Sequence, residues 1–350
     1  MNPDAEKPMT AASLALDVAA MAAADRASAL AKETDWSGLW FDLIEKESGD
    51  YVGMRAAHVP APGKNAVWHF LTHSSRDGIG ALVELMRRGN PGADIPMPRL
   101  KDTSQPARLA QVGALLRLMA VWPRCARWQT HDRAWAPPAG VPRPGTAVAA
   151  RILDAEQTRR VEERARAERV SFNSLLLAAL GRATQSELSE GPAYWMMPVN
   201  MRGPVAKADE SANHTAYLRV NVARDTTPAG VQATIKRCFA NNEHWGSWLF
   251  LHIGRVVGHT GMKLIYRTEI ARWRGCLWAG AFSNLGTWNG CGEWLVAPPV
   301  AKSCPLAAGA IICNGKLGLT IDAHASIAKD AVWTEALMDR WITELARLAN

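Results

Sequence analysis

The chain has 350 residues, a mass of 38.1 kDa and a formal net charge of +7, from 40 basic and 33 acidic side chains. With 48% hydrophobic and 21% charged residues, it is a globular chain and not a disordered, collagen-like or heptad-based one. No apolar run approaches the ~20 residues of a membrane-spanning helix. Residues 1–6 are acidic where a signal peptide is basic, so we expect a cytoplasmic protein.

The positive charge is spread along the whole sequence. No basic run is interleaved with aromatic residues, which disfavours nucleic-acid binding. The same charge suits the phosphates of a cofactor or an acidic carrier protein. The cysteines form no CxxC pair, which argues against a zinc ribbon or a thioredoxin-like motif, and we expect no metal site. They are Cys125, Cys238, Cys276, Cys291, Cys304 and Cys313.

The first half predicts helices and one buried strand. Apolar spacing indicates an amphipathic helix within residues 11–31, a strand over residues 66–72, and a helix that begins near Ile79. A segment rich in proline at residues 132–148 predicts a linker. We therefore expect an N-terminal lobe over residues 1–131 and a C-terminal lobe over residues 149–350.

The second half mixes both kinds of element. Residues 154–168 predict a charged surface helix, and residues 173–184 predict a core helix. Residues 214–224 alternate as a strand, and the turn at Asn314-Gly315 indicates a hairpin. The chain ends in an amphipathic helix after Asp330. Together the elements predict an α+β fold with layered sheets and helices.

The residues best suited to chemistry are His73, Asp77 and Gly78, in an HxxxDG motif between the predicted strand and helix. An imidazole at a strand end is held by rigid backbone and titrates near neutral pH, so it suits a general base. Asp77 is placed to fix the loop by pairing with an arginine, and Gly78 permits a tight turn. The alternative is a surface histidine beside a helix-capping aspartate.

Further stretches follow in a fixed order and extend the pattern. Residues 169–180 read RVSFNSLLLAAL, residues 197–202 read MPVNMR, residues 213–215 read NHT and residues 282–286 read FSNLG. With the HxxxDG motif they resemble the chloramphenicol acetyltransferase-like superfamily. It includes nonribosomal peptide condensation domains and the wax ester synthase and diacylglycerol acyltransferase branch. The resemblance runs from about Ala66 to the C-terminus.

This resemblance implies two similar lobes with a channel between them, in which an acyl thioester meets a hydroxyl or amine acceptor. The donor is coenzyme A or the phosphopantetheine of an acyl or peptidyl carrier protein, and no cofactor is tightly bound. His73 corresponds to the general base, and Ser283 or Asn284 to the oxyanion donor. Asp77 corresponds to a structural residue, for which Arg202 is one candidate partner.

Two features depart from the family pattern. Thr72 stands where condensation domains commonly carry a second histidine, and only 72 residues precede His73, so the N-terminal lobe is shortened. This leaves a compact enzyme, a catalytically weak relative or a mispredicted start codon. Acyl transfer is the main hypothesis. Its rivals are a non-catalytic assembly or carrier-binding subunit and an amide-forming condensation enzyme.

Other candidates carry less weight. Trp278 and Trp288 flank the Ser283-Asn284 segment and are candidates for a pocket wall, although packing is the default for tryptophan. His69 is four residues from His73, a spacing that on a strand does not bring two ligands to one metal. His324 is interpreted as a structural or surface histidine. The sequence has no GxSxG, Walker A or GxGxxG motif.

Overall fold

The computed structural model describes residues 35–50, 52–59, 66–90, 92, 94–101, 104–120, 126–129, 148–207, 209–223, 225–272, 278–289, 292–328 and 330–349. The predicted helix within residues 11–31 and all but the last residue of the predicted linker, 132–148, lie outside these ranges. The boundary between the two predicted lobes therefore stays a prediction.

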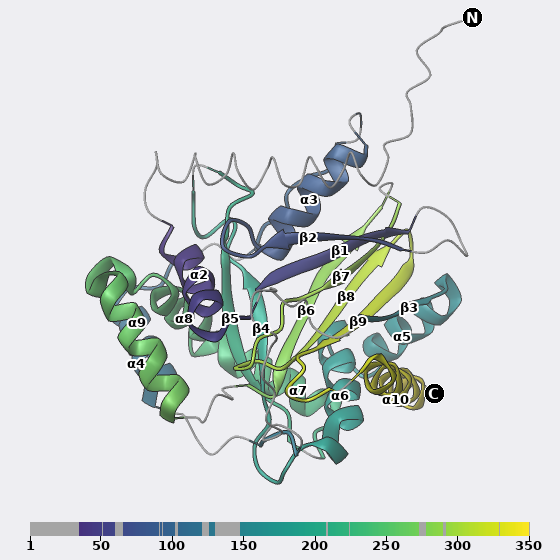
Figure 1. The fold of residues 1–350 in the computed structure, drawn as a ribbon. Helices are drawn as coiled ribbons and strands as arrows, with labels where there is room; N and C mark the ends of the chain where they lie inside the picture. Colours follow the sequence, from purple (N-terminus) through teal and green to yellow (C-terminus); the bar gives the residue numbers. More distant parts are fainter. Residues whose placement is uncertain are drawn as a thin grey trace, which may run out of the picture.

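The larger sheet crosses the middle of the molecule (Figure 1). Its six strands, within the described residues, follow the order β3-β9-β8-β6-β4-β5. They are β3 (Ala149–Leu153), β4 (Tyr194–Asn200), β5 (Thr215–Asn221), β6 (Gly280–Trp288), β8 (Leu306–Cys313) and β9 (Lys316–Ala323). Asn314 and Gly315 both have positive φ in the β8–β9 turn, which confirms the predicted hairpin.

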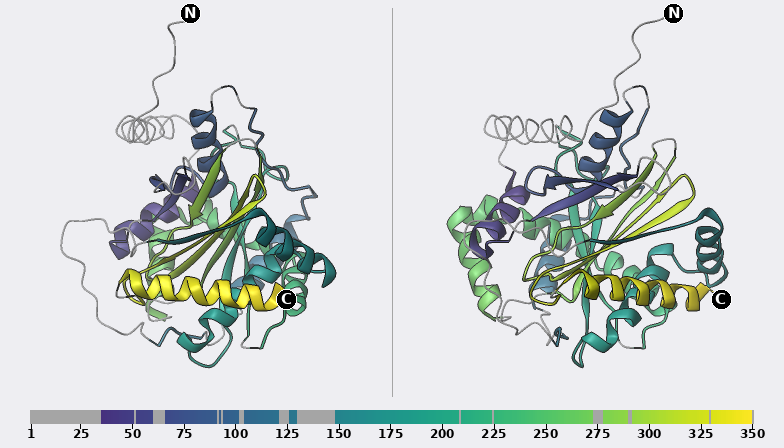
Figure 2. Two further views of the ribbon diagram at one scale, coloured as in Figure 1. Left: turned by 90° about the vertical axis from the view of Figure 1, so that its right-hand side faces the viewer. Right: turned by 45° about the vertical axis from the view of Figure 1, so that its right-hand side comes forward.

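Four helices cover one face of this sheet and enclose the largest hydrophobic core (Figures 1 and 2). They are α5 (Ala155–Ala167), α6 (Phe172–Thr184), α7 (Pro228–Ala240) and α10 (Ala331–Ala349). The central residues of α6 are buried on every side, as expected for a core helix. A stripe on α10 that contains Leu337 and Trp341 is fully buried, which confirms its predicted amphipathic pattern.

The smaller sheet has the order β2-β1-β7, with both pairs antiparallel. Its strands are β1 (Gly53–Val59), β2 (Val67–Thr72) and β7 (Glu293–Ala297), and α3 (Gly78–Gly89) follows β2. β7 comes from the second half of the chain. It lies over β8, because a side chain at Gly309 would meet the Val296 carbonyl at 1.9 Å, so glycine alone permits this approach. The mixed architecture confirms the predicted α+β class.

The remaining helices gather beside β5 and the smaller sheet (Figure 1). They are α2 (Trp36–Ser48), α4 (Arg108–Ala120), α8 (Glu243–Leu251) and α9 (Gly254–Arg272), with a short 3₁₀ turn η1 (Gln185–Glu187) elsewhere. α8 packs on β5, α4 packs on α8, and α2 packs on α9. None of the helices in the described ranges is long and apolar enough to cross a bilayer.

Candidate active site

A cavity of about 340 Å³ lies among β4, β5, β6, the β2–α3 junction and helices α2, α4, α8 and α9. Most of its wall is aromatic or aliphatic, and no Asp, Glu, Lys or Arg is among the described residues that line it. The side chains with a nitrogen, oxygen or thiol group that line it are Trp40, His73, Asn200, Thr215, Tyr217, Tyr266, Trp278, Ser283, Asn284, Ser303 and Cys304. Such a space accepts an apolar, uncharged group and offers it a few hydrogen-bonding partners.

His73 is held in the cavity wall from several directions. Its backbone N–H donates to the Val52 carbonyl at 3.2 Å, and its ring stacks on Phe41 of α2 at 4.1 Å between centroids. Its Nδ1 lies 2.9 Å from the carbonyl oxygen of Arg76. Because a carbonyl oxygen only accepts, this bond requires the proton on Nδ1. The neutral ring then carries a lone pair on Nε2, where it can accept a proton.

The electrostatic surroundings favour this neutral form. Burial lowers the pKa of His73 below its ordinary value of 6.5, while the bond to the Arg76 carbonyl and the charge of Asp77 partly oppose the shift. His73 is therefore neutral at pH 7 and available as a proton acceptor.

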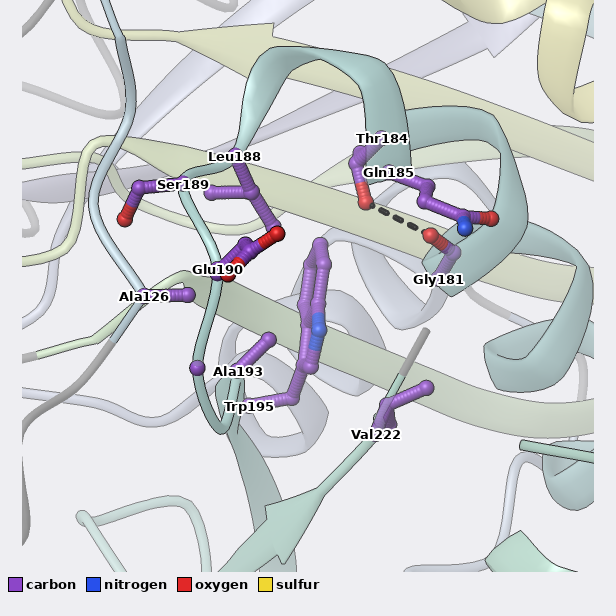
Figure 3. Close-up of a pocket in the computed structure, with 11 residues that line it drawn as sticks. Ala126, Gly181, Thr184, Gln185, Leu188, Ser189, Glu190, Ala193, Trp195 and Val222 are labelled. Carbon is purple, nitrogen blue, oxygen red and sulfur yellow. Dashed lines mark hydrogen bonds between the residues drawn. The ribbon is translucent and has the colours of Figure 1, made fainter. Parts of the chain in front are cut away.

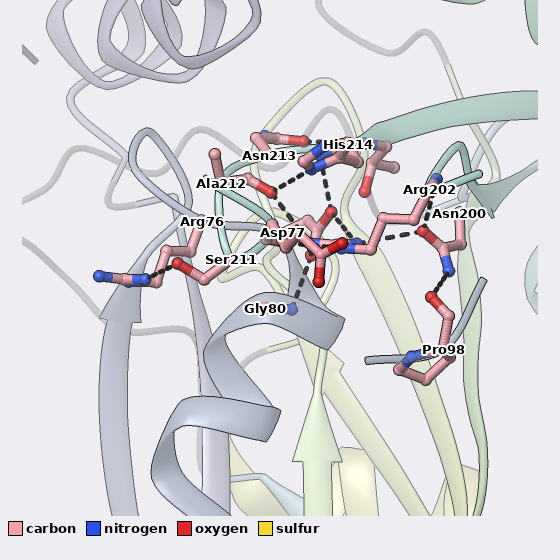
Figure 4. A network of polar contacts seen from close by, with 12 residues as sticks. Arg76, Asp77, Gly80, Pro98, Asn200, Arg202, Ser211, Ala212, Asn213 and His214 are labelled. Carbon is pink, nitrogen blue, oxygen red and sulfur yellow. Dashed lines mark hydrogen bonds and ion pairs between the residues drawn. The ribbon is translucent and has the colours of Figure 1, made fainter. Parts of the chain in front are cut away.

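Asp77 is buried beneath this loop and has all its acceptor positions occupied (Figure 4). It caps α3, because its Oδ1 accepts from Gly80 N–H at 2.8 Å. Its Oδ2 accepts from the backbone N–H of His214 at 2.8 Å. Both oxygens also accept from Arg202, at 2.8 and 2.9 Å. The carboxylate does not line the cavity, so its contacts support a structural function.

Arg202 uses all five of its N–H groups in this network (Figure 4). Two donate to Asp77, one to the Asn200 side chain at 3.1 Å, and two to the backbone carbonyls of Glu210 and Ala212 at 2.7 and 2.9 Å. The residue is 3% exposed, so the pair is a buried ion pair with its hydrogen bonds satisfied. The sequence raised Arg202 as a partner of Asp77, and the structure brings the two together.

Gly78 differs from its sequence interpretation. It is the first residue of α3 and is not among the glycines with positive φ, so no left-handed turn requires it. It lines the cavity, and a Cβ there would lie 3.2 Å from the sulfur of Met54 and 3.3 Å from Leu285. Glycine at this position therefore leaves space in the cavity wall beside Met54 of β1 and Leu285 of β6.

Ser283 and Asn284 both line the cavity but have different partners. Asn284 Nδ2 donates to the Asn173 side chain of α6 at 2.6 Å, and its Oδ1 accepts from Gly286 N–H at 2.9 Å. Ser283 follows Ala281 on the same face of β6, since side chains alternate along a strand. No described residue forms a hydrogen bond with its hydroxyl group. Ser283 is thus the better placed of the two to contact a ligand.

Of the two tryptophan candidates, one lines the cavity and the other does not. Trp278 lines the cavity, where its ring meets Tyr217 edge-on. Trp288 does not: it is buried in the core between the two sheets, and its Nε1 donates to the Leu285 carbonyl at 2.9 Å. Trp288 lies further along β6, beyond an irregularity between Asn284 and Thr287, where it pairs with Cys313.

A second, smaller pocket of about 180 Å³ lies where the end of α6 meets the start of β4 (Figure 3). The indole of Trp195 stands among the residues that line it, and Glu190 and Gln185 supply polar groups. None of the residues predicted for the site lies there. No histidine is among the described residues that line this pocket.

The other histidines named from the sequence lie away from the cavity. His69 is buried on β2 and does not line it. His324 Nε2 lies 2.9 Å from Asp50 Oδ1 and Nδ1 lies 2.8 Å from Ser326 Oγ, a buried structural contact. In the described parts of the chain, no three His, Cys, Asp or Glu side chains gather as a metal site requires.

No protein-family model matches the sequence, and no curated protein matches it. Solved structures do match, among them the EpoB nonribosomal peptide synthetase cyclization-docking bidomain from Sorangium cellulosum. It has 13% identity and a TM-score of 0.54, with 81% of this chain and 60% of that chain covered. A second nonribosomal peptide synthetase, with AMPPNP bound, has 16% identity and a TM-score of 0.53 over 81% of this chain and 31% of that one.

A wax ester synthase/diacylglycerol acyltransferase from Marinobacter aquaeolei also matches, with 13% identity and a TM-score of 0.48 over 81% of this chain and 66% of that one. The chain has the two-lobed condensation-domain fold that the sequence resemblance implied. It spans about 60% of the length of the EpoB bidomain, and at these identities the likeness concerns the fold alone.

We expect Asp77→Asn to lower the free energy of unfolding by about 3–5 kcal/mol, because it leaves the Arg202 guanidinium buried beside a neutral amide. Urea titration followed by circular dichroism measures the loss. The double variant Asp77→Asn/Arg202→Met should lose less than the two single losses added together, since it removes both charges.

The matched control is Glu210→Gln, which removes the exposed ion pair between Glu210 and Arg99. An exposed pair contributes less than ~1 kcal/mol. If Asp77→Asn costs no more than Glu210→Gln, the buried pair does not hold the loop in the way described above.

Proposed function

We propose that the protein transfers an acyl group from a coenzyme A or phosphopantetheine thioester to a hydroxyl group, with His73 as the general base. The observation that carries the proposal is that His73 combines a position in the cavity wall with a hydrogen bond that fixes its tautomer. The ring lines an apolar cavity, and its Nδ1 donates to the Arg76 carbonyl, which leaves Nε2 free to take a proton. The condensation-domain fold supports the general class of reaction.

In the proposed reaction, Nε2 of His73 takes the proton of the acceptor hydroxyl as its oxygen attacks the thioester carbonyl carbon. The carbonyl π electrons move to oxygen and form a tetrahedral oxyanion. When this collapses, the C–S bond breaks and the sulfur leaves as a thiolate, which takes the proton from the imidazolium. The products are an ester and a free thiol, and His73 returns to its neutral form.

The oxyanion requires a hydrogen-bond donor in the cavity, and we assign this function to Ser283. Its hydroxyl has no partner among the described residues, and it lies on the cavity face of β6. The Asn284 amide already holds β6 to α6 through Asn173, so we assign it a positioning function. A donor fixed in an apolar space contributes more than the same donor in water.

The charge of the cavity wall favours a hydroxyl acceptor over an amine. An amine substrate arrives as an ammonium ion at neutral pH, and burying that ion without a carboxylate partner is costly. No acidic residue is among the described residues that line the cavity. The amide-forming alternative therefore has weaker support than ester formation.

The proposal includes two possible sources of the thioester, coenzyme A and a carrier protein. The matched structures include nonribosomal peptide synthetases, which is consistent with a carrier-protein partner. Coenzyme A presents the same phosphopantetheine arm, and the net charge of +7 suits either an acidic carrier protein or the coenzyme A phosphates. Assays that supply acyl-coenzyme A or acyl-carrier protein alone distinguish the two sources.

The proposal is tested by incubating the purified chain with acyl-coenzyme A or acyl-carrier protein and a panel of alcohols and amines. Intact-mass analysis of the acceptors then detects acylation. We expect His73→Gln to lower turnover by ~10²–10⁴-fold, the usual contribution of a general base, with the circular dichroism spectrum unchanged.

His69→Gln is the matched control, because His69 is a buried histidine on β2, the strand that leads to His73, and does not line the cavity. This variant should keep its turnover. Equal turnover in His73→Gln and the unmodified protein would exclude His73 as the base. Transfer to no acceptor, together with stable binding of a carrier protein, would favour the non-catalytic alternative.

The pH dependence of kcat/KM should show a single ascending limb from His73, because only its neutral form accepts a proton. Since burial lowers the pKa of His73, the midpoint should lie below 6.5, with a plateau above it. The profile is measured with a neutral alcohol as acceptor, so that the acceptor does not titrate. A midpoint above 6.5 would contradict the assignment.

Ser283→Ala should reduce kcat by ~10²–10³-fold with little effect on thioester affinity, because an oxyanion donor acts only as charge develops. Asn284→Ala should instead lower the melting temperature, since it removes the contact with Asn173. The pair is compared by steady-state kinetics and thermal unfolding. A change in KM alone for Ser283→Ala would make Ser283 a binding residue.

A further inference from the structure

Tyr217 places a phenol in the same cavity wall as the proposed oxyanion donor. It lies on β5, at the edge of the larger sheet, and it is 8% exposed. Its ring meets Trp278 at 5.5 Å between centroids and an angle of 84°. The sequence pattern puts Tyr217 on the face of β5 opposite Ala216 and Leu218, and that face forms cavity wall.

The hydroxyl group of Tyr217 has no hydrogen-bond partner among the described residues. Burial raises the pKa of Tyr217, so the phenol keeps its proton and remains a donor. Tyr266 is the contrast within the same cavity: the Ser48 side chain interacts with its hydroxyl and opposes the upward shift of its pKa that burial causes. An unpaired donor in an apolar wall costs free energy that a ligand oxygen recovers.

The position of Tyr217 is fixed by its backbone. Its N–H donates to Ser247 Oγ of α8 at 2.9 Å, and that hydroxyl donates to the Tyr217 carbonyl at 2.7 Å. Serine and threonine hydroxyls can turn to a nearby backbone group, whereas a phenol is too far from its own backbone to do so. The donor therefore stays in the cavity.

Tyr217 and Ser283 belong to one row across the sheet. Tyr217 pairs with Pro198 on β4, and Met196 of β4 pairs with Ala281 of β6 in parallel register. Two residues further along, this register places Pro198 beside Ser283. The two hydroxyl-bearing residues thus lie two strands apart, about 10 Å between backbones, on the cavity face.

We infer that Tyr217 selects an acyl chain that carries an oxygen atom, as a hydroxyl, keto or ether group, some way along the chain from its carbonyl. With the carbonyl at Ser283, the chain crosses the Pro198 position and brings that oxygen to the phenol. The rest of the wall is apolar and suits the chain itself. The inference rests on the proposed acyl transfer for the position of the carbonyl.

The test compares acyl-coenzyme A thioesters of one chain length that carry no added oxygen, a 3-hydroxyl, a mid-chain hydroxyl or keto group, or a terminal hydroxyl. Calorimetry gives the dissociation constant of each with the unmodified protein, Tyr217→Phe and Tyr266→Phe. The phenylalanine at position 217 keeps the ring contact with Trp278. Tyr266→Phe is the matched control, because the hydroxyl that it removes lines the same cavity but interacts with the Ser48 side chain.

We expect the unmodified protein to bind at least one oxygen-bearing chain about tenfold to a hundredfold more tightly than the plain chain. Tyr217→Phe should abolish this preference, and Tyr266→Phe should keep it. An equal preference in the unmodified protein and Tyr217→Phe, or no preference at all, would overturn the inference.

The outcomes separate the two proposals. A Tyr217-dependent preference in binding without transfer to any acceptor would overturn acyl transfer and leave the selectivity intact. If the protein transfers both plain and oxygen-bearing chains and binds them with equal affinity, the proposed selectivity is wrong and acyl transfer stands. Binding of no thioester would overturn both.

Discussion

The ion pair between Asp77 and Arg202 is the contact on which the site depends. It joins the start of α3 to the segment between β4 and β5, and the Arg202 carbonyl also accepts from Leu100 N–H. The same segment reaches His73, whose carbonyl accepts from the Asn213 side chain. A carboxylate and a guanidinium that occupy all their hydrogen-bonding positions permit one arrangement of these segments. The proposed chemistry in the cavity therefore relies on charges that lie outside it.

The charged pair lies behind the cavity wall, and this position also explains why His73 is neutral. An aspartate close to an imidazole ordinarily raises its pKa, yet the net shift here is downward. Asp77 is already paired with Arg202 and bonded to two backbone N–H groups, so its attraction for a second positive charge is largely offset. Desolvation in the apolar cavity then dominates. The arrangement gives a neutral base next to a carboxylate, which a lone Asp77 would not.

The sequence predicts those parts of the site that depend on local pattern. The apolar run of β2, His73 at its end and the Asp77 cap of α3 are read directly from spacing, and the structure has them at those positions. Contacts between distant segments carry no such signal: Phe41 reaches His73 from α2, and Tyr217 faces a cavity only because β4, β6 and α8 surround it. Trp288 lies in the core between the two sheets, beyond an irregularity in β6 that periodicity does not reveal.

The way in which His73 is enclosed bears on whether the site is catalytic. β1 has partners on both edges, because β7 from the second half of the chain completes the smaller sheet, and α8 and α9 supply cavity wall beside α2. The second half of the chain thus supplies a strand of the smaller sheet and much of the cavity wall around His73. A surface that only binds a partner has no need to bury an imidazole and orient it through a backbone carbonyl, since burying polar groups costs stability. The cost is understandable if the neutral ring takes part in proton transfer, and this argument favours the enzyme over the assembly subunit.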